Sequence, residues 1–301
     1  MDETPFGFFR ARDGIQLRYG WWPQAGKSDR GTLVVLGGRT EFMEKYLETI
    51  RRLTLRGYRV CSMDWRGQGL SDRMLSDPTR GYVRSYDQYV DDMAMLFETI
   101  VRPYGSRPVL VLSHSMGGNI LLHYLSRFPG IVDKGVLLSP MIDIPMAPVP
   151  ALLARWACRL MVRLGKADGN IPAGRRNGSI SRTFEKNHLT HDRARFREIQ
   201  KMIHENGQLA VTGVTFGWLD ATFRAIDAIN RPGVAGKVRI PLLLVTAGDD
   251  GIVDNHAIRS FAARVPVHQI VNIDGAFHEI LQEKKEIQDE FWRAFDRFLD
   301  L

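Results

Sequence analysis

The sequence predicts one α/β domain with a mostly parallel central sheet, helices on both faces and an inserted helical lid. Three observations lead to this fold class. Short apolar runs alternate with segments of helical periodicity from residue 31 to 139, the alternation stops from 140 to about 236, and it resumes at 240. Such alternation is typical of parallel sheets, because each parallel connection needs a crossover that is usually a helix.

The first part of the chain predicts a hairpin followed by strands and helices in turn. Asp13-Gly14 separates two alternating aromatic and β-branched segments, which predicts a hairpin over residues 6–22. Strands are expected at the apolar runs 31–36, 58–63, 108–112 and 134–139, and helices at 44–56, 85–101 and 119–127. Ser85 is expected to cap the second of these helices.

The interrupted part, residues 141–236, predicts helices and no clear strand. Helical patterns cover residues 151–164, 191–206 and 215–229. We interpret this part as a lid over the C-terminal edge of the sheet, inserted between core segments 1–140 and 237–301. The core then closes with strands at 240–246 and 268–273 and helices at 255–264 and 284–299.

Composition and charge exclude several classes of protein. The 301 residues are 44% hydrophobic, enough for a large core. Two distant cysteines, Cys61 and Cys158, argue against a disulfide framework and favour a reducing compartment. The N-terminus has no signal-peptide core and no apolar run is long enough to cross a bilayer. We therefore expect a cytoplasmic protein, with peripheral contact to the inner face of the membrane as a further option.

The net charge of +7 raises nucleic acid or an anionic membrane as partners. The basic residues are dispersed among Asp and Glu, and no nucleic-acid motif is present. We expect no nucleic-acid partner; the alternatives are a solvated basic surface and transient contact with an anionic membrane surface. The sequence does not determine the oligomeric state.

A serine is predicted at the apex of a tight turn between a buried strand and a helix. The stretch runs Ser113-His114-Ser115-Met116-Gly117-Gly118. Small residues two positions before and after Ser115 let the strand and helix approach closely, as in a nucleophile elbow. Here those positions hold Ser113 and Gly117, so serine replaces the first glycine of the usual pattern.

Two later strands are followed by residues that suit a serine nucleophile. Asp249 and Asp250 follow one strand, and His278 lies in the segment after the next. A serine hydroxyl needs an imidazole to take its proton, and the imidazole needs a carboxylate on its other nitrogen. The chain order Ser, Asp, His at successive strand ends is that of α/β-hydrolases. It favours Ser115 as nucleophile and His278 as base, with the acid open between Asp249 and Asp250.

Acyl transfer also requires donors that stabilise the developing oxyanion. The backbone N–H of Met116, at the start of the helix, is one candidate. The loop Gly37-Gly38-Arg39, after the first parallel strand, offers the amide of Arg39 as the second.

Five segments of the chain together resemble the bacterial lysophospholipase and monoacylglycerol lipase branch of the α/β-hydrolases. They are Gly38-Arg39, Asp64–Ser71, Ser113–Gly118, Asn187–Thr190 and Gly275–Glu279, and the resemblance extends from about Phe8 to the C-terminus. It implies an esterase acting on one fatty acyl chain attached to glycerol, a lysophospholipid or monoacylglycerol, with no metal or organic cofactor. The family usually has His-Gly where this chain has Gly37-Gly38.

The family register, counted back from Ile252-Val253-Asp254, implies Asp250 as the acid, with Asp249 as the alternative. Asp254 is expected to cap the following helix. Two other functions stay open: a general carboxylesterase for small soluble esters, and an inactive relative that only binds an acylated ligand.

Three further features have weaker functional interpretations. Gly67-Gln68-Gly69 is only a fragment of a dinucleotide-binding pattern, and we expect no such cofactor. His188 and His191 lack the partners of a metal site, so we expect no metal and place them at the junction of lid and core. The apolar face of helix 151–164, with its arginines, is expected either to pack in the core or to contact lipid.

Overall fold

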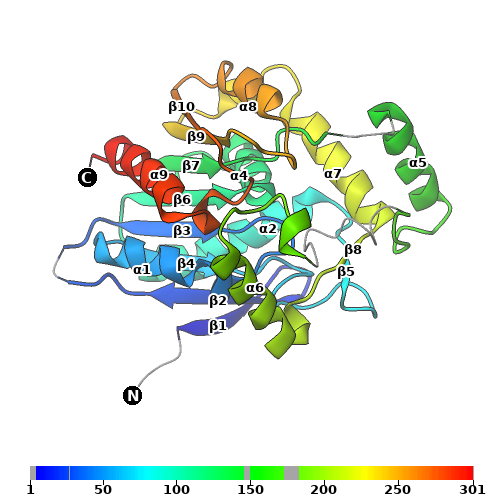
Figure 1. The fold of residues 1–301 in the computed structure, drawn as a ribbon, viewed down its shortest axis with the longest axis horizontal. Helices are drawn as coiled ribbons and strands as arrows, with labels where there is room; N and C mark the ends of the chain where they lie inside the picture. Colours follow the sequence, from blue (N-terminus) through cyan, green and yellow to red (C-terminus); the bar gives the residue numbers. More distant parts are fainter. Residues whose placement is uncertain (1–4, 27, 146–149, 173–182, 301) are drawn as a thin grey trace.

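The computed structural model describes residues 5–26, 28–145, 150–172 and 183–300. It contains an eight-stranded sheet in the order β1-β2-β4-β3-β6-β7-β9-β10, flanked by helices (Figure 1). The α/β class and the mostly parallel sheet are thereby confirmed. Residues 1–4, on which the expectation about a signal peptide depends, lie outside the described residues.

The strands agree with the apolar runs to within a few residues. Their bounds are β1 Phe6–Arg10, β2 Gln16–Trp22, β3 Thr32–Leu36, β4 Arg59–Met63, β6 Val109–His114, β7 Lys134–Leu138, β9 Leu242–Ala247 and β10 His268–Ile273. β1 and β2 form the predicted antiparallel hairpin, and β2 is also antiparallel to β4. All other pairs in this sheet are parallel, so the carboxyl ends of β3, β6, β9 and β10 meet at one edge.

The helices likewise follow the predicted segments. Their bounds are α1 Leu47–Leu55, α2 Tyr86–Leu96, α3 Arg102–Tyr104, α4 Met116–Arg127, α5 Ala151–Arg163, α6 Arg193–Glu205, α7 Phe216–Ile229, α8 Asn255–Ala262 and α9 Lys285–Phe298. Ser85 and Asp254 accept backbone N–H bonds as N-caps of α2 and α8, as predicted. A 3₁₀ turn, Met43–Tyr46, precedes α1, and a π-helical segment, Phe97–Val101, follows α2.

The expectation of no strand between residues 140 and 236 was wrong at one place. β8, Gly213–Val214, pairs in parallel with β5, Arg80–Gly81, in a separate two-stranded sheet. A two-residue strand carries no periodicity of its own, so only its distant partner defines it. α7 packs against α4, with His123 Nε2 3.1 Å from the carbonyl oxygen of Ala225. The lid boundaries 141 and 236 stay a prediction.

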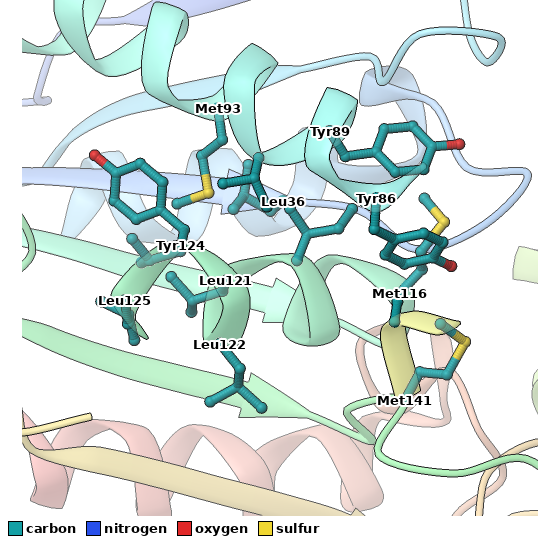
Figure 2. Packing of buried hydrophobic residues seen from close by; sticks show 14 of the residues in the cluster. Leu36, Tyr86, Tyr89, Met93, Met116, Leu121, Leu122, Tyr124, Leu125 and Met141 are labelled. Atoms are coloured by element: carbon teal, nitrogen blue, oxygen red, sulfur yellow. The ribbon is translucent and has the colours of Figure 1, made fainter. Parts of the chain in front are cut away.

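Two apolar clusters cover the two faces of the sheet. α1 and α9 contribute to one cluster, and α2, α4, α7 and α8 to the other, part of which is drawn in Figure 2. Within β6, Val109 and Val111 face one cluster while Leu110 and Leu112 face the other. β6 is thus buried on both faces, which is why its sequence is a continuous apolar run. The turn that follows β6 is therefore anchored to a strand that is packed on both faces.

Candidate active site

Ser115 occupies the turn between β6 and α4 in a strained backbone conformation. Its φ is 49° and its ψ is −113°, values that residues other than glycine adopt rarely. The turn is held by two backbone bonds: the N–H of Ser115 donates to Leu138 at 2.9 Å, and the N–H of Met141 donates to the carbonyl of Ser115 at 3.0 Å. The surrounding structure therefore imposes this conformation, which lifts the serine out of the strand.

The small residues of the elbow are required by close contacts. A Cβ atom on Gly117 would lie 2.6 Å from the carbonyl oxygen of Gly37, at the end of β3. No such clash occurs at Ser113, whose buried hydroxyl lies 3.4 Å from the carbonyl oxygen of Val136. The serine in place of the usual glycine is accommodated because its side chain points toward β7 and finds a polar partner there.

The structure brings Asp250, and not Asp249, to His278. Nδ1 of His278 lies 2.8 Å from Oδ2 of Asp250. The other oxygen of Asp250 accepts the backbone N–H groups of Ile252 and Val253 at 2.8 and 3.1 Å. The side chain of Asp249 is exposed, and its backbone N–H donates to Ala276. Since the carboxylate accepts at Nδ1, that nitrogen carries the proton and Nε2 is left as the acceptor.

The electrostatics of Asp250 fit an ionised orienting group. Burial alone would raise the pKa of this carboxyl, but the bond to His278, its charge and the two backbone N–H donors outweigh burial and lower the pKa. Asp250 is therefore a carboxylate at neutral pH. It can stabilise a positive charge on His278.

The loop that carries His278 packs directly against the elbow. His114, the residue before Ser115, has Nε2 3.1 Å from the carbonyl oxygen of His278, and the two imidazole rings lie 4.7 Å apart. The backbone N–H of Glu279 donates to Leu189 at 2.9 Å, which ties the same loop to the segment before α6. Among the described residues, the hydroxyl of Ser115 has no hydrogen-bond partner. Such bonds commonly tighten only when substrate is present.

The loop after β3 lies on the other side of the elbow. A Cβ atom on Gly38 would lie 3.1 Å from Cβ of Ser115, a tighter contact than most Cβ atoms make, so glycine favours this approach. Arg39 follows; its guanidinium donates to the carbonyl of Gly213 at 2.6 Å and lies 4.7 Å from the ring centroid of Trp218. The side chain of Arg39 thus connects this loop to β8 and α7. The roles of the Arg39 and Met116 amides as oxyanion donors stay predictions.

A buried cluster of charged groups beneath the elbow was missed by the sequence analysis. Nδ1 of His114 lies 3.1 Å from Oε2 of Glu41, which also accepts the hydroxyl of Tyr46 at 2.5 Å. Lys45 bridges Glu41 and Glu279 at 2.7 and 2.6 Å, with all three side chains nearly inaccessible. The i, i+4 spacing of Glu41 and Lys45 was the only local signal, and it is also common on exposed helices.

The protonation states in this cluster follow from its contacts. Burial would raise the pKa of Glu41, but Lys45 and His114 hold it well below its usual range. Burial likewise opposes a charge on His114, yet the carboxylate of Glu41 prevails and raises its pKa. The cluster therefore holds paired charges directly beneath the residue that precedes Ser115.

The histidine pair considered for metal binding lies at the junction with the loop of His278. Nδ1 of His191 lies 2.8 Å from Oε1 of Glu283, and its ring stacks on Phe277 with centroids 3.7 Å apart. Within the described parts of the chain, no group of three or more His, Cys, Asp or Glu residues could hold a metal ion. His191 instead supports the segment that positions His278.

The sheet order, the strained serine after β6 and the Asp250–His278 pair after β9 and β10 define an α/β-hydrolase. The family described as "Serine aminopeptidase, S33" matches residues 27–285, and the chain belongs to this family.

Several known proteins are similar to this chain over at least 92% of its length. The lysophospholipase L2 of Escherichia coli (strain K12) is 35% identical, with 100% of this chain and 85% of that protein covered. The monoacylglycerol lipase of Mycolicibacterium smegmatis is 26% identical, over 92% and 91% of the two chains. A soluble variant of monoglyceride lipase from Saccharomyces cerevisiae, solved with a substrate analogue, superimposes with a TM-score of 0.77 at 17% identity, covering 100% and 97%. This last likeness shows the fold.

Proposed function

We propose that the chain hydrolyses the carboxylic ester of a single-chain acyl glycerolipid, a lysophospholipid or a monoacylglycerol. The observation that carries this proposal is the 2.8 Å bond between Asp250 and His278, in a loop packed on the residue that precedes Ser115. The lysophospholipase and monoacylglycerol lipase names of the relatives support this substrate class.

In the first half of the reaction, Oγ of Ser115 attacks the ester carbonyl carbon while Nε2 of His278 takes the hydroxyl proton. Asp250 holds the imidazole in the required tautomer and stabilises the imidazolium. The amides of Met116 and Arg39 donate to the oxyanion of the tetrahedral intermediate. Collapse breaks the ester C–O bond, and the imidazolium gives its proton to the leaving glycerol oxygen.

In the second half, water attacks the acyl-enzyme on Ser115, and His278 accepts a proton from that water. The tetrahedral intermediate again places its negative charge at the same amides. Its collapse releases the fatty acid, and the proton returns to Ser115. No metal or organic cofactor enters these steps.

A fluorophosphonate probe followed by a substrate panel tests the proposal. The chain is expected to be labelled and Ser115→Ala to be unlabelled; equal labelling of both, or none of either, contradicts the catalytic role and favours an inactive acyl-binding relative. The panel contains lysophosphatidylcholine, monoacylglycerols and short p-nitrophenyl esters. Turnover of the short esters alone would favour a general carboxylesterase.

We also propose that residues 141–236 act as a lid whose helix α5 contacts an anionic membrane surface. One side of α5 packs on α7 through the buried Cys158 and an ion pair of Arg155 with Asp227. The opposite side exposes large apolar side chains, with Leu152 81% and Trp156 66% accessible. Leu153, Leu160 and Leu164 extend this apolar face.

The charge of α5 favours an anionic lipid surface as the partner of this face. The helix contains three arginines and no acidic residue. Arg163 is exposed beside the apolar face, and Arg159 lies 3.9 Å from Asp220 with over half of its side chain accessible. Among the helices that the structure describes, none has the length and apolarity to cross a bilayer. Contact through α5 is therefore interfacial.

Vesicle flotation tests this contact. We expect binding to phosphatidylglycerol vesicles to exceed binding to phosphatidylcholine vesicles, and to be lost in the double variant Leu152→Ser, Trp156→Ser. The control Leu55→Ser removes from α1 a leucine about as exposed as Trp156 and should bind normally. If the double variant instead only converts a dimer into a monomer in solution, the face contacts a second copy and the membrane proposal fails.

A further inference from the structure

A cavity lies at the edge of the sheet opposite the one that carries Ser115. Its volume is about 580 Å³, within the range of small-molecule sites. It is lined by the π-helical segment Phe97–Val101, the last turns of α4 and the loops that precede β6 and β7. β6 begins at this cavity with Val109 and ends beside Ser115, so the two sites are separated by the length of a strand, roughly 20 Å.

The inner wall of the cavity is aromatic. The ring of Tyr124 stacks on Phe97 with centroids 5.3 Å apart and lies 5.0 Å from Phe128. All three side chains line the cavity, together with Ile131. The accessible part of this wall is apolar and therefore suits an alkyl chain.

Tyr124 also presents an unsatisfied polar group. The residue is fully buried, and its hydroxyl has no hydrogen-bond partner among the described residues. Figure 2 shows this hydroxyl directed away from the leucines of the same cluster, with Met116 at the opposite end. An unpaired buried hydroxyl is rare in folded proteins. This one is inaccessible, so a molecule bound in the cavity lies above it and does not contact it.

The backbone next to Tyr124 is irregular where it borders the cavity. α2 ends at Leu96, and the chain continues as a π-helix through Phe97–Val101 before it returns to α3. Phe97 and Val101 of this segment line the cavity. π-helical turns are uncommon and often occur at functional sites.

The rim of the cavity is positively charged. Arg12, Arg102 and Arg107 line it, against a single carboxylate, Glu98. Arg107 is already bound to Asp133 at 3.1 Å. Arg12 and Arg102 are exposed and form no ion pair with the described residues. Guanidinium groups without a protein partner are suited to bind a carboxylate or phosphate.

We propose that this cavity is a second binding site, for an amphiphile with one alkyl chain and an anionic head group. The chain lies against Phe128 and Ile131, above the buried rings of Phe97 and Tyr124, and the head group binds Arg12 and Arg102. A fatty carboxylate and an alkyl phosphate share this chemistry. The site uses neither Ser115 nor its partners, so it does not depend on the proposed hydrolase function.

Isothermal titration with laurate below its micelle concentration tests the site. The double variant Arg12→Gln, Arg102→Gln is expected to weaken laurate binding at this site at least about tenfold, because it removes both charged partners of the carboxylate. The control Arg51→Gln removes an exposed charge from α1 and should bind like the unmodified chain. Equal binding in all three proteins overturns the proposal.

Three other ligands identify the head group. Binding of dodecyl phosphate is expected to depend on the same arginines. Whichever of dodecyl phosphate and laurate binds more tightly carries the preferred head group. Dodecyl maltoside, which has a chain and no charge, and inorganic phosphate, which has a charge and no chain, should both bind at least about tenfold more weakly. Equal binding of dodecyl maltoside would contradict recognition of an anion.

Two variants inside the cavity complete the test. Ile131→Trp fills the mouth and should abolish the laurate site, with circular dichroism reporting whether the fold is intact. Tyr124→Phe removes the unsatisfied hydroxyl beneath the cavity, so it should raise the melting temperature and leave laurate binding unchanged. If Ile131→Trp, correctly folded, binds laurate unchanged, the cavity is not the site.

Discussion

The imidazole of His114 forms a buried ion pair with Glu41, with 3.1 Å between Nδ1 and Oε2. Its other nitrogen, Nε2, lies 3.1 Å from the carbonyl oxygen of His278. A carboxylate and a carbonyl can only accept, so both ring nitrogens must donate and His114 is the imidazolium. Because Glu41 also accepts the backbone N–H of Gly38, this pair ties the loop after β3, the elbow and the His278 loop together.

Replacing Glu41 should therefore destabilise the fold. Glu41→Gln leaves His114 and Lys45 short of a buried counter-charge, which is expected to cost about 3 kcal/mol of unfolding free energy. Glu48→Gln is the control, because Glu48 pairs with Arg195 at the surface and such pairs contribute about 1 kcal/mol or less. Urea unfolding measures both. A loss in Glu41→Gln no larger than in the control would mean that the pair is not structural.

The two neighbouring aspartates should differ sharply in their effect on turnover. Asp250→Asn replaces the acceptor at Nδ1 of His278 with a group that favours the wrong tautomer, and kcat is expected to fall by about 10⁴. Asp249→Asn alters an exposed side chain and should change kcat by less than about twofold. Hydrolysis of a p-nitrophenyl ester measures both rates. The reverse order would move the acid to Asp249.

The elbow should tolerate a change at Ser113 and reject one at Gly117. In Gly117→Ala the new Cβ would lie 2.6 Å from the carbonyl oxygen of Gly37, which predicts a loss of about 1–3 kcal/mol and weaker fluorophosphonate labelling. Ser113→Gly restores the usual motif and should label normally. Gly207→Ala, where a Cβ meets nothing within 4 Å, is the control for alanine itself. Normal labelling and stability of Gly117→Ala would show that the contact can relax.

Buried His123 should make stability depend on pH. Burial disfavours the charged ring and lowers its pKa to about 4, although the hydrogen bond to the carbonyl of Ala225 opposes this shift. The unfolded chain binds this proton near pH 6.5, so the stabilisation is complete above that pH. It is lost progressively as the pH falls toward 4, by about 3 kcal/mol in total.

The variant His123→Gln isolates this effect. Glutamine keeps an N–H donor for Ala225 and does not titrate, so its stability should fall less between pH 6.5 and 4 than that of the unmodified chain. His256→Gln removes an exposed histidine and serves as the matched control. Chemical denaturation at several pH values gives the difference. Identical pH profiles for the His123 variant and the unmodified chain would contradict the buried neutral state.

The order of strands and helices was predictable because most elements have a local signal in the sequence. β6 is a continuous apolar run because it is buried on both faces. Asp13-Gly14 is a hairpin turn signal, and the structure places it between β1 and β2. The strand β8 was missed because two residues carry no period. Its existence depends on pairing with β5, far away in the chain.

The sequence by itself determined the chain order of Ser115, the aspartate pair and His278 at strand ends, because strand periodicity and turn residues are local properties. Only the tertiary structure decided that Asp250 meets His278, that Glu41 and Lys45 are buried beneath His114, and that Arg12 and Arg102 border a cavity. Each of these depends on contacts between distant segments. Burial and the charge of a spatial neighbour decide the chemistry of an ionisable group, and neither can be read from the residues next to it in the chain.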